Sequence, residues 1–215
     1  MARILFGLDR LPRTMGADDP RLPGVAASGG VLRLNTEALP AAAMEGVAGA
    51  DHAARMAALV QWLEGLCGEY AAVRRRFVAS YCAMLGASVA ARREELAAGL
   101  ARFDGLYAPE DWVWSAPRPL PRAWVPGGGG MVFAEVAFRL ASGPVAVVLG
   151  EAGRASGQEA ALLAAGVGVR FVGAEVLAGG PAALGAALGE GFWRFEVGER
   201  VPVGAFRRGV GGVVG

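Results

Sequence analysis

The sequence predicts an α/β (α+β) protein in which a helical N-terminal half packs on a small mixed β-sheet. Two observations carry this prediction. Apolar residues recur every three to four positions between about residues 51 and 103, which is the spacing of one face of a helix. Residues 131–173 then read as a strand, a tight turn, a buried strand, a capped helix and another strand, the order of a hairpin–helix–strand core.

Composition divides the 215 residues into four regions. We expect a mainly helical region over 1–105, a connection rich in Pro, Trp and Gly over 106–130, an α/β core over 131–195 and a flexible C-terminal tail over 196–215. A chain of this length buries roughly 70% of the surface that its unfolded form exposes. Its fold therefore requires neither a disulfide nor a metal.

The helical region contains three predicted helices. Asp51 is a suitable N-cap for a helix that reaches about Cys67, because an Asp carboxylate accepts hydrogen bonds from the free amides of a first turn. A second helical pattern begins at Glu69. Ser88 is predicted to cap a third helix that reaches Phe103. The stripes of apolar residues on these helices are typical of core.

The connection over 106–130 holds five of the twelve prolines, three of the five tryptophans and a run of four glycines. Residues 111–114 are predicted as a short edge strand. The proline-rich part is predicted as an extended connection across the domain, because each proline lacks the N–H group that a sheet uses and has a fixed φ. Upstream, residues 31–35 alternate and predict one short strand in an otherwise irregular segment.

The α/β core has the clearest local signals. Val145–Leu149 is apolar on both faces, which is typical of a strand covered on both sides. Ser156 begins a helix with capping-box spacing, and Gly166 is predicted to end it. Residues 167–172 return as a strand, which should lie parallel to the first because a helix joins the two. A last helix is predicted over 180–188, with a proline at its start.

Composition excludes several kinds of site. All 21 basic residues are arginine, so no Schiff-base lysine or phosphate-loop lysine exists. His52 is the single histidine, which excludes sites that need two imidazoles. Cys67 and Cys82 both fall in helical patterns and are expected to be buried free thiols.

Charge is spread evenly along the chain. Residues 1–112 carry 12 Arg against 13 acids, residues 113–215 carry 9 Arg against 7 acids, and the net charge is +1. A dedicated nucleic-acid-binding protein usually has a larger basic excess. No apolar run approaches the roughly 18 residues of a membrane span, and the first residues make a poor signal peptide. We therefore expect a cytoplasmic protein without membrane association.

Four short segments of the core follow a known order: 135–138 (EVAF), 147–150 (VVLG), 166–171 (GVGVRF) and 175–177 (EVL). With the helix that precedes them, they resemble the core of the PD-(D/E)XK nuclease superfamily, in particular its small members related to very-short-patch repair endonucleases. The resemblance covers about residues 131–188. It implies a mixed sheet with a hairpin, a helix and a further strand.

The chemistry of that superfamily requires two or three carboxylates that converge on Mg²⁺. Glu135 stands where the first acid belongs, but the second and third positions hold Val147 and Leu149. The lysine of the usual E-x-K motif is also missing. Glu151, just beyond the strand, is the candidate for a relocated ligand. The alternative role for Glu135 is that of a surface residue paired with Arg139.

A second resemblance competes with the first. Residues 150–153 (GEAG), 172–177 (VGAEVL) and 182–184 (AAL) resemble the cofactor-binding region of SPOUT-class rRNA methyltransferases, which implies SAM-dependent methyl transfer. The chain departs from that pattern in side chains that bind substrate. The motif's Pro, Arg, Glu and Thr positions hold Glu151, Ala178, Gly180 and Pro181.

Arginines provide the candidate binding residues. The loop over 150–154 leads to a helix N-terminus, where free amides and the helix dipole attract anions, and Arg154 would assist. The alternative is an ordinary strand-to-helix turn. Three consecutive arginines offer phosphate contacts or form a solvated helix face. The candidate binding residues are Arg154, Arg139, Arg74, Arg75 and Arg76.

The sequence therefore favours a non-catalytic protein of nuclease-like fold that binds a macromolecular partner, either nucleic acid or protein. The alternative is an enzyme: a metal-dependent nuclease with relocated acids, with Glu135 and Glu151 as catalytic residues, or a SPOUT-type RNA methyltransferase. Mg²⁺ is the expected cofactor of the nuclease only, and a degenerate fold would have none.

Overall fold

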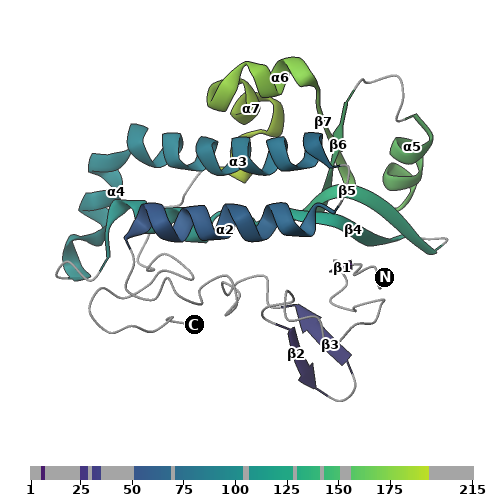
Figure 1. Ribbon diagram of the computed structural model, residues 1–215, viewed down its shortest axis with the longest axis horizontal. Helices are drawn as coiled ribbons and strands as arrows, with labels where there is room; N and C mark the ends of the chain where they lie inside the picture. Colours follow the sequence, from purple (N-terminus) through teal and green to yellow (C-terminus); the bar gives the residue numbers. More distant parts are fainter. Residues whose placement is uncertain are drawn as a thin grey trace.

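The computed structural model describes residues 6–7, 25–28, 31–34, 51–68, 71–103, 107–127, 130–140, 143–150 and 156–193. In this part of the chain, helices and a mixed sheet form the α/β arrangement that the sequence predicts (Figure 1). The predicted fold class is confirmed. None of the described helices is long and apolar enough to cross a membrane.

The helical region begins with two long helices, α2 (His52–Leu66) and α3 (Ala72–Ala91). Asp51 caps α2 as predicted, and its carboxylate accepts a hydrogen bond from the Ala54 amide at 2.8 Å. The predicted cap at Ser88 is wrong. Ser88 lies inside α3, where its hydroxyl donates to the carbonyl of Met84 one turn earlier at 2.9 Å. The helix instead breaks at Arg92, and α4 (Arg93–Leu100) follows.

Two 3₁₀ helices follow α4: η1 (Ala101–Phe103) and η2 (Pro109–Ser115). The edge strand predicted over 111–114 is therefore wrong. Asp111 is buried, and one carboxylate oxygen accepts the Ala108 amide at 2.7 Å while the other accepts Arg55 Nη2 at 3.3 Å. An Asp that bonds the backbone three residues earlier stabilises a turn in place of a strand.

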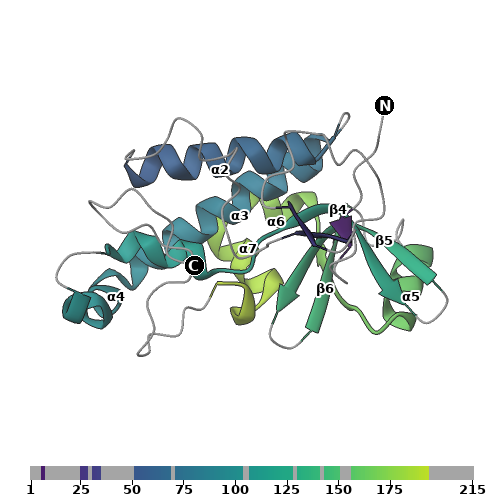
Figure 2. The ribbon, with the colours of Figure 1, turned by 90° about the horizontal axis from the view of Figure 1, so that it is seen from below.

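The main sheet has the strand order β1-β4-β5-β6-β7, and Figure 2 shows its strands β4, β5 and β6 from below. Its members are β1 (Phe6–Gly7), β4 (Leu120–Gly127), β5 (Gly130–Leu140), β6 (Gly143–Leu149) and β7 (Gly168–Val172). Strands β4, β5 and β6 are antiparallel neighbours. Residues 120–127 thus pair in the sheet, although the sequence predicts only an extended connection there.

Prolines are tolerated in β4 because few of its residues have a partner on both sides. Within the described residues, strand β1 pairs with β4 at Ala123 and Trp124, and β5 borders the other side. Pro121 and Pro126 lie outside the doubly paired stretch, as expected for proline in a strand. A separate hairpin consists of β2 (Val25–Ser28) and β3 (Val31–Leu34), and β3 matches the short strand predicted over 31–35.

The unit β6–α5–β7 agrees with its prediction. Helix α5 (Ser156–Ala164) joins β6 to β7, and the two strands pair in parallel from Val145↔Gly168 to Leu149↔Val172. Gly166 ends the helix with φ +76°, a left-handed conformation that glycine adopts without strain. Two short helices follow, α6 (Ala174–Ala178) and α7 (Gly180–Leu188), then η3 (Glu190–Phe192).

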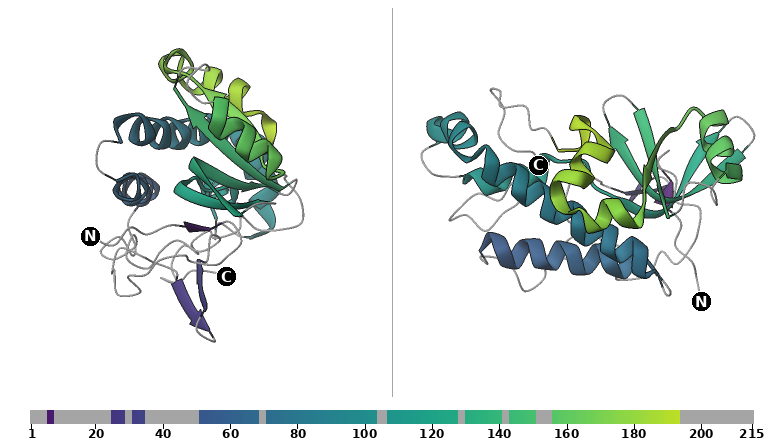
Figure 3. Two further views of the ribbon diagram at one scale, coloured as in Figure 1. Left: turned by 90° about the vertical axis from the view of Figure 1, so that its right-hand side faces the viewer. Right: turned by 90° about the horizontal axis from the view of Figure 1, so that it is seen from above.

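Each face of the sheet is covered by helices. Val136, Phe138, Val145, Val147 and Val172 pack with α2, α3, α6 and α7 in the larger core cluster. The smaller cluster packs Leu162 of α5 against the opposite face. Figure 3 shows α2 and α3 side by side at one side of the sheet. The helical region and the α/β core therefore share one hydrophobic core.

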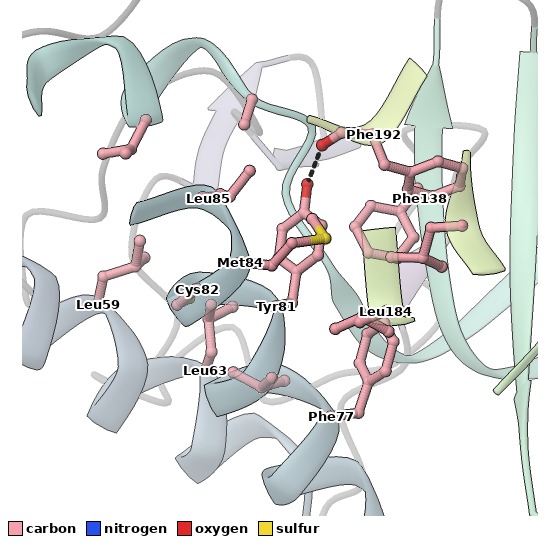
Figure 4. Close-up of a cluster of buried hydrophobic side chains, with 14 of the residues drawn as sticks. Leu59, Leu63, Phe77, Tyr81, Cys82, Met84, Leu85, Phe138, Leu184 and Phe192 are labelled. Carbon is pink, nitrogen blue, oxygen red and sulfur yellow. Dashed lines mark hydrogen bonds between the residues drawn. The ribbon is translucent and has the colours of Figure 1, made fainter. Parts of the chain in front are cut away.

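Aromatic rings occupy the centre of the larger cluster (Figure 4). Phe138 of β5 contacts Phe192 edge-on, with ring centroids 4.9 Å apart, and Tyr81 of α3 at 5.1 Å. Phe77 lies one helical turn before Tyr81 and reaches the same phenylalanine at 6.2 Å. Each such pair contributes about 0.5–1.5 kcal/mol beyond its buried area.

Tyr81 also provides the polar contacts of this core. Its side chain is fully buried, and its hydroxyl lies 2.6 Å from the carbonyl oxygen of Pro117 and 2.9 Å from that of Phe192. Burial raises the pKa of Tyr81 well above its ordinary value, so the hydroxyl keeps the proton that it donates. One side chain thereby links α3 to the segment before β4 and to η3.

Replacement of Tyr81 by Phe should destabilise the protein by about 1–3 kcal/mol, because the carbonyls of Pro117 and Phe192 lose the single O–H donor that they share. Urea denaturation followed by circular dichroism measures this loss. Ser88→Ala is the matched control, since it also removes one hydroxyl from α3 but should change stability by less than about 0.5 kcal/mol. Equal effects of the two substitutions would contradict the role given to Tyr81.

Candidate functional site

Glu135 lies on β5 where the pairing between β5 and β6 ends. The last paired residues there are Val136 and Val147. Beyond them, the backbone amide of Leu149 donates to Glu135 Oε2 at 3.3 Å, so a side chain replaces the next strand partner. Glu135 is thus held beside the carboxyl end of β6.

Arg74, near the start of α3, is the second described partner of Glu135. Arg74 Nη1 lies 3.7 Å from Glu135 Oε1, and Arg74 Nε donates to the carbonyl of Cys67 at 3.2 Å. Both side chains of the ion pair are partly exposed, at 19% and 30%. An ion pair of this exposure contributes at most about 1 kcal/mol.

Two further arginines meet Arg74 at the C-terminal end of α2. Arg75 Nη2 donates to the carbonyl of Gly68 at 3.2 Å. The guanidinium of Arg122, from β4, also lies against Gly68. Figure 1 shows the end of α2 and the start of α3 beside β4 and β5. We call Arg74, Arg75 and Arg122 the arginine cluster.

The backbone at this cluster adopts two unusual conformations. Gly68 has φ +83°, and Arg122 has φ +56°, the single positive φ among the described residues other than glycine. For a residue other than glycine, a positive φ costs on the order of 1 kcal/mol of stability. A Cβ on Gly68 would lie 2.9 Å from Arg122 Nη1, so the close approach of the arginine requires glycine.

Cys67 lies beneath the cluster as a buried free thiol, and Cys82 is likewise buried and free. Burial raises the pKa of Cys67 to about 11, although the nearby charges of Arg74 and Arg75 oppose the shift. Burial raises the pKa of Cys82 to about 12. The thiolate is the nucleophilic form, so neither cysteine is suited to nucleophilic catalysis near neutral pH.

The positions of the second and third nuclease acids face the core. Val147 is fully buried in the larger cluster, and Leu149 packs against that cluster. Among the described residues, no group of three or more His, Cys, Asp or Glu side chains is arranged to hold a metal ion. The described side-chain partner of Glu135 is therefore Arg74, and the two positions that the resemblance assigns to further acids hold apolar side chains of the core.

The structure brings together some of the predicted site residues. Glu135, Arg74 and Arg75 meet around the end of α2, while Arg76 is exposed on the same turn of α3. Glu151 and Arg154 lie outside the described residues. Arg139 pairs through its backbone with Pro144, and its side chain lies outside the described part. The contacts described for Glu135 are with Arg74 and Leu149, and its predicted pairing with Arg139 stays a prediction.

Sequence reasoning missed Arg122 and a second polar contact. The signal for Arg122 is weak, since one arginine in a proline-rich segment does not reveal a positive φ. The second contact joins Arg55 of α2 to the buried Asp111 at 3.3 Å. Burial lowers the pKa of the neighbouring His52, and the charge of Asp111 opposes this shift. This contact fixes η2 against α2 and has a structural role.

Comparison of the chain with protein-family models, with curated proteins and with solved structures found no match.

Gly68→Ala should destabilise the protein by about 1–2 kcal/mol, because alanine is strained at a positive φ and its Cβ would displace Arg122. Gly86→Ala is the control: Gly86 is exposed within α3, and a Cβ there meets nothing within 4 Å. In the control variant, the free energy of unfolding should rise by about 0.4–1 kcal/mol. Chemical denaturation distinguishes the two signs, and a stabilising Gly68→Ala would contradict this geometry.

Proposed function

We propose that the chain is a non-catalytic protein of nuclease-like fold that binds a macromolecular partner. The order of elements supports this proposal: helices α3 and α4, strand β4, the β5–β6 hairpin, helix α5 and the parallel strand β7. The PD-(D/E)XK resemblance implies the same order, although its first strand was expected over 111–114.

One observation carries the non-catalytic part of the proposal. The carboxylate of Glu135 is engaged by the Leu149 amide and by the guanidinium of Arg74. A cation in that position competes with a metal for the same oxygens, because both are attracted to the carboxylate charge. The adjacent strand supplies the buried Val147 where a second ligand would be needed. Among the described residues, a metal-activated water would lack the converging carboxylates that orient it.

The same feature suits binding. Glu135 fixes Arg74, and the carbonyls at the end of α2 fix Arg74 and Arg75. Guanidinium groups held in this way lose less conformational entropy when a partner binds than free side chains do. The partner is a nucleic acid or a protein with acidic groups.

A cleavage assay tests the proposal. Single-stranded DNA, double-stranded DNA and RNA, incubated with the protein and Mg²⁺ or Mn²⁺, should remain intact, and Glu135→Gln should give the same result. Glu94→Gln, which alters an exposed acid on α4, is the matched control. Metal-dependent cleavage that Glu135→Gln abolishes and Glu94→Gln retains would overturn the proposal in favour of an active nuclease.

A further inference from the structure

The arginine cluster carries more positive charge than the described carboxylates near it neutralise. The described acids that act on this region are Glu135, which pairs with Arg74, and Glu64, whose charge reaches Cys67. The three arginines of the cluster thus have two described carboxylates near them, in a chain whose overall net charge is +1.

The start of α3 makes this excess less favourable. Its first turn contains no acid, and Ala71 at the N-cap offers no side-chain hydrogen bond. A helix N-terminus carries about half a positive charge, and each cation placed there costs about 0.3–1 kcal/mol. The negative C-terminal end of α2, whose carbonyls accept from Arg74 and Arg75, offsets part of this cost. A negatively charged ligand would relieve this repulsion.

The cluster also retains many unused donors. A guanidinium has five N–H groups in a planar fork. The contacts with the end of α2 occupy Nε of Arg74 and one terminal nitrogen of Arg75. The fork geometry matches the oxygens of a phosphate, which it binds through two parallel hydrogen bonds. Arg122, whose backbone has a positive φ, places a third guanidinium group beside Gly68.

The residues around the arginine cluster suit a phosphate ligand better than a protein partner. The core of a protein interface is apolar and rich in aromatic residues. In the described part of the chain, the exposed large hydrophobic residues are Val73, a single side chain next to Arg74, and Leu163, which belongs to α5. A nucleic acid needs no such patch, because its affinity comes mainly from phosphate contacts. We propose that the arginine cluster binds the phosphate backbone of a nucleic acid, an inference that rests on the proposed binding function.

The test is a salt titration of binding. Fluorescence anisotropy with labelled single-stranded and double-stranded DNA and with RNA gives the slope of log K against log salt. For double-stranded DNA the slope falls by about 0.9 for each lost phosphate contact. Arg75→Gln combined with Arg122→Gln should therefore reduce the slope by about 2 and weaken binding at least tenfold near physiological salt.

The matched control changes the same charge elsewhere. Arg92→Gln combined with Arg93→Gln removes two arginines at the other end of α3, roughly 25 Å away at 1.5 Å per residue. This control should keep the wild-type slope. Arg75→Lys combined with Arg122→Lys should keep most of the slope, because the charges remain. Thermal denaturation of every variant shows that binding is compared between folded proteins.

Two results would overturn the inference. The first is equal loss of affinity in the cluster variant and in the Arg92/Arg93 control, which would indicate a diffuse effect of net charge. The second is absence of wild-type binding to all three nucleic acids at low salt, which would leave a protein as the partner. Both results come from the binding titration, whereas the non-catalytic proposal fails only if metal-dependent cleavage is observed. The two failures can therefore be told apart.

Discussion

The hydroxyl of Tyr81 needs hydrogen-bond partners inside a core that water does not reach. It finds them in the carbonyls of Pro117 and Phe192, which lie 36 and 111 residues further along the chain. Around this contact, rings from α3, β5 and η3 pack edge to face. An unsatisfied carbonyl in such surroundings would cost about 1–3 kcal/mol. The helical region and the sheet are therefore fixed to each other at the centre of their shared core.

The position of α3 on the sheet determines which side chains meet at the N-terminal end of this helix. With Tyr81 and Phe77 packed against Phe138, the first turn of α3 lies beside the carboxyl end of β6. Arg74 then reaches Glu135, and the free carbonyls at the end of α2 receive Arg74 and Arg75. Cations are favourable at the negative end of a helix dipole, which explains how the fold holds several arginines together. The same contacts leave donors for a phosphate.

Elements with local signals were predictable from the sequence. The cap at Asp51, the end of α5 at Gly166 and the parallel strand β7 each depend on a few neighbouring residues. Elements stabilised by distant residues were not. In the 3₁₀ helix over 109–115, Asp111 accepts a local amide and also contacts Arg55, 56 residues away, while the apolar pattern of the segment resembles a strand. The candidate site was predicted in part, since Arg122 joins it through a backbone conformation that no sequence pattern shows.

The claim that one core unites the helical region with the sheet is tested most directly by native-state hydrogen exchange. The slowest amides of α3 and those of the β5–β6 pair should exchange with the same free energy of opening, equal to that of global unfolding, because both elements share the ring cluster around Tyr81. Opening of residues 72–91 at a clearly lower free energy than the β5–β6 pair would contradict this account, since the helices would then unfold independently of the sheet.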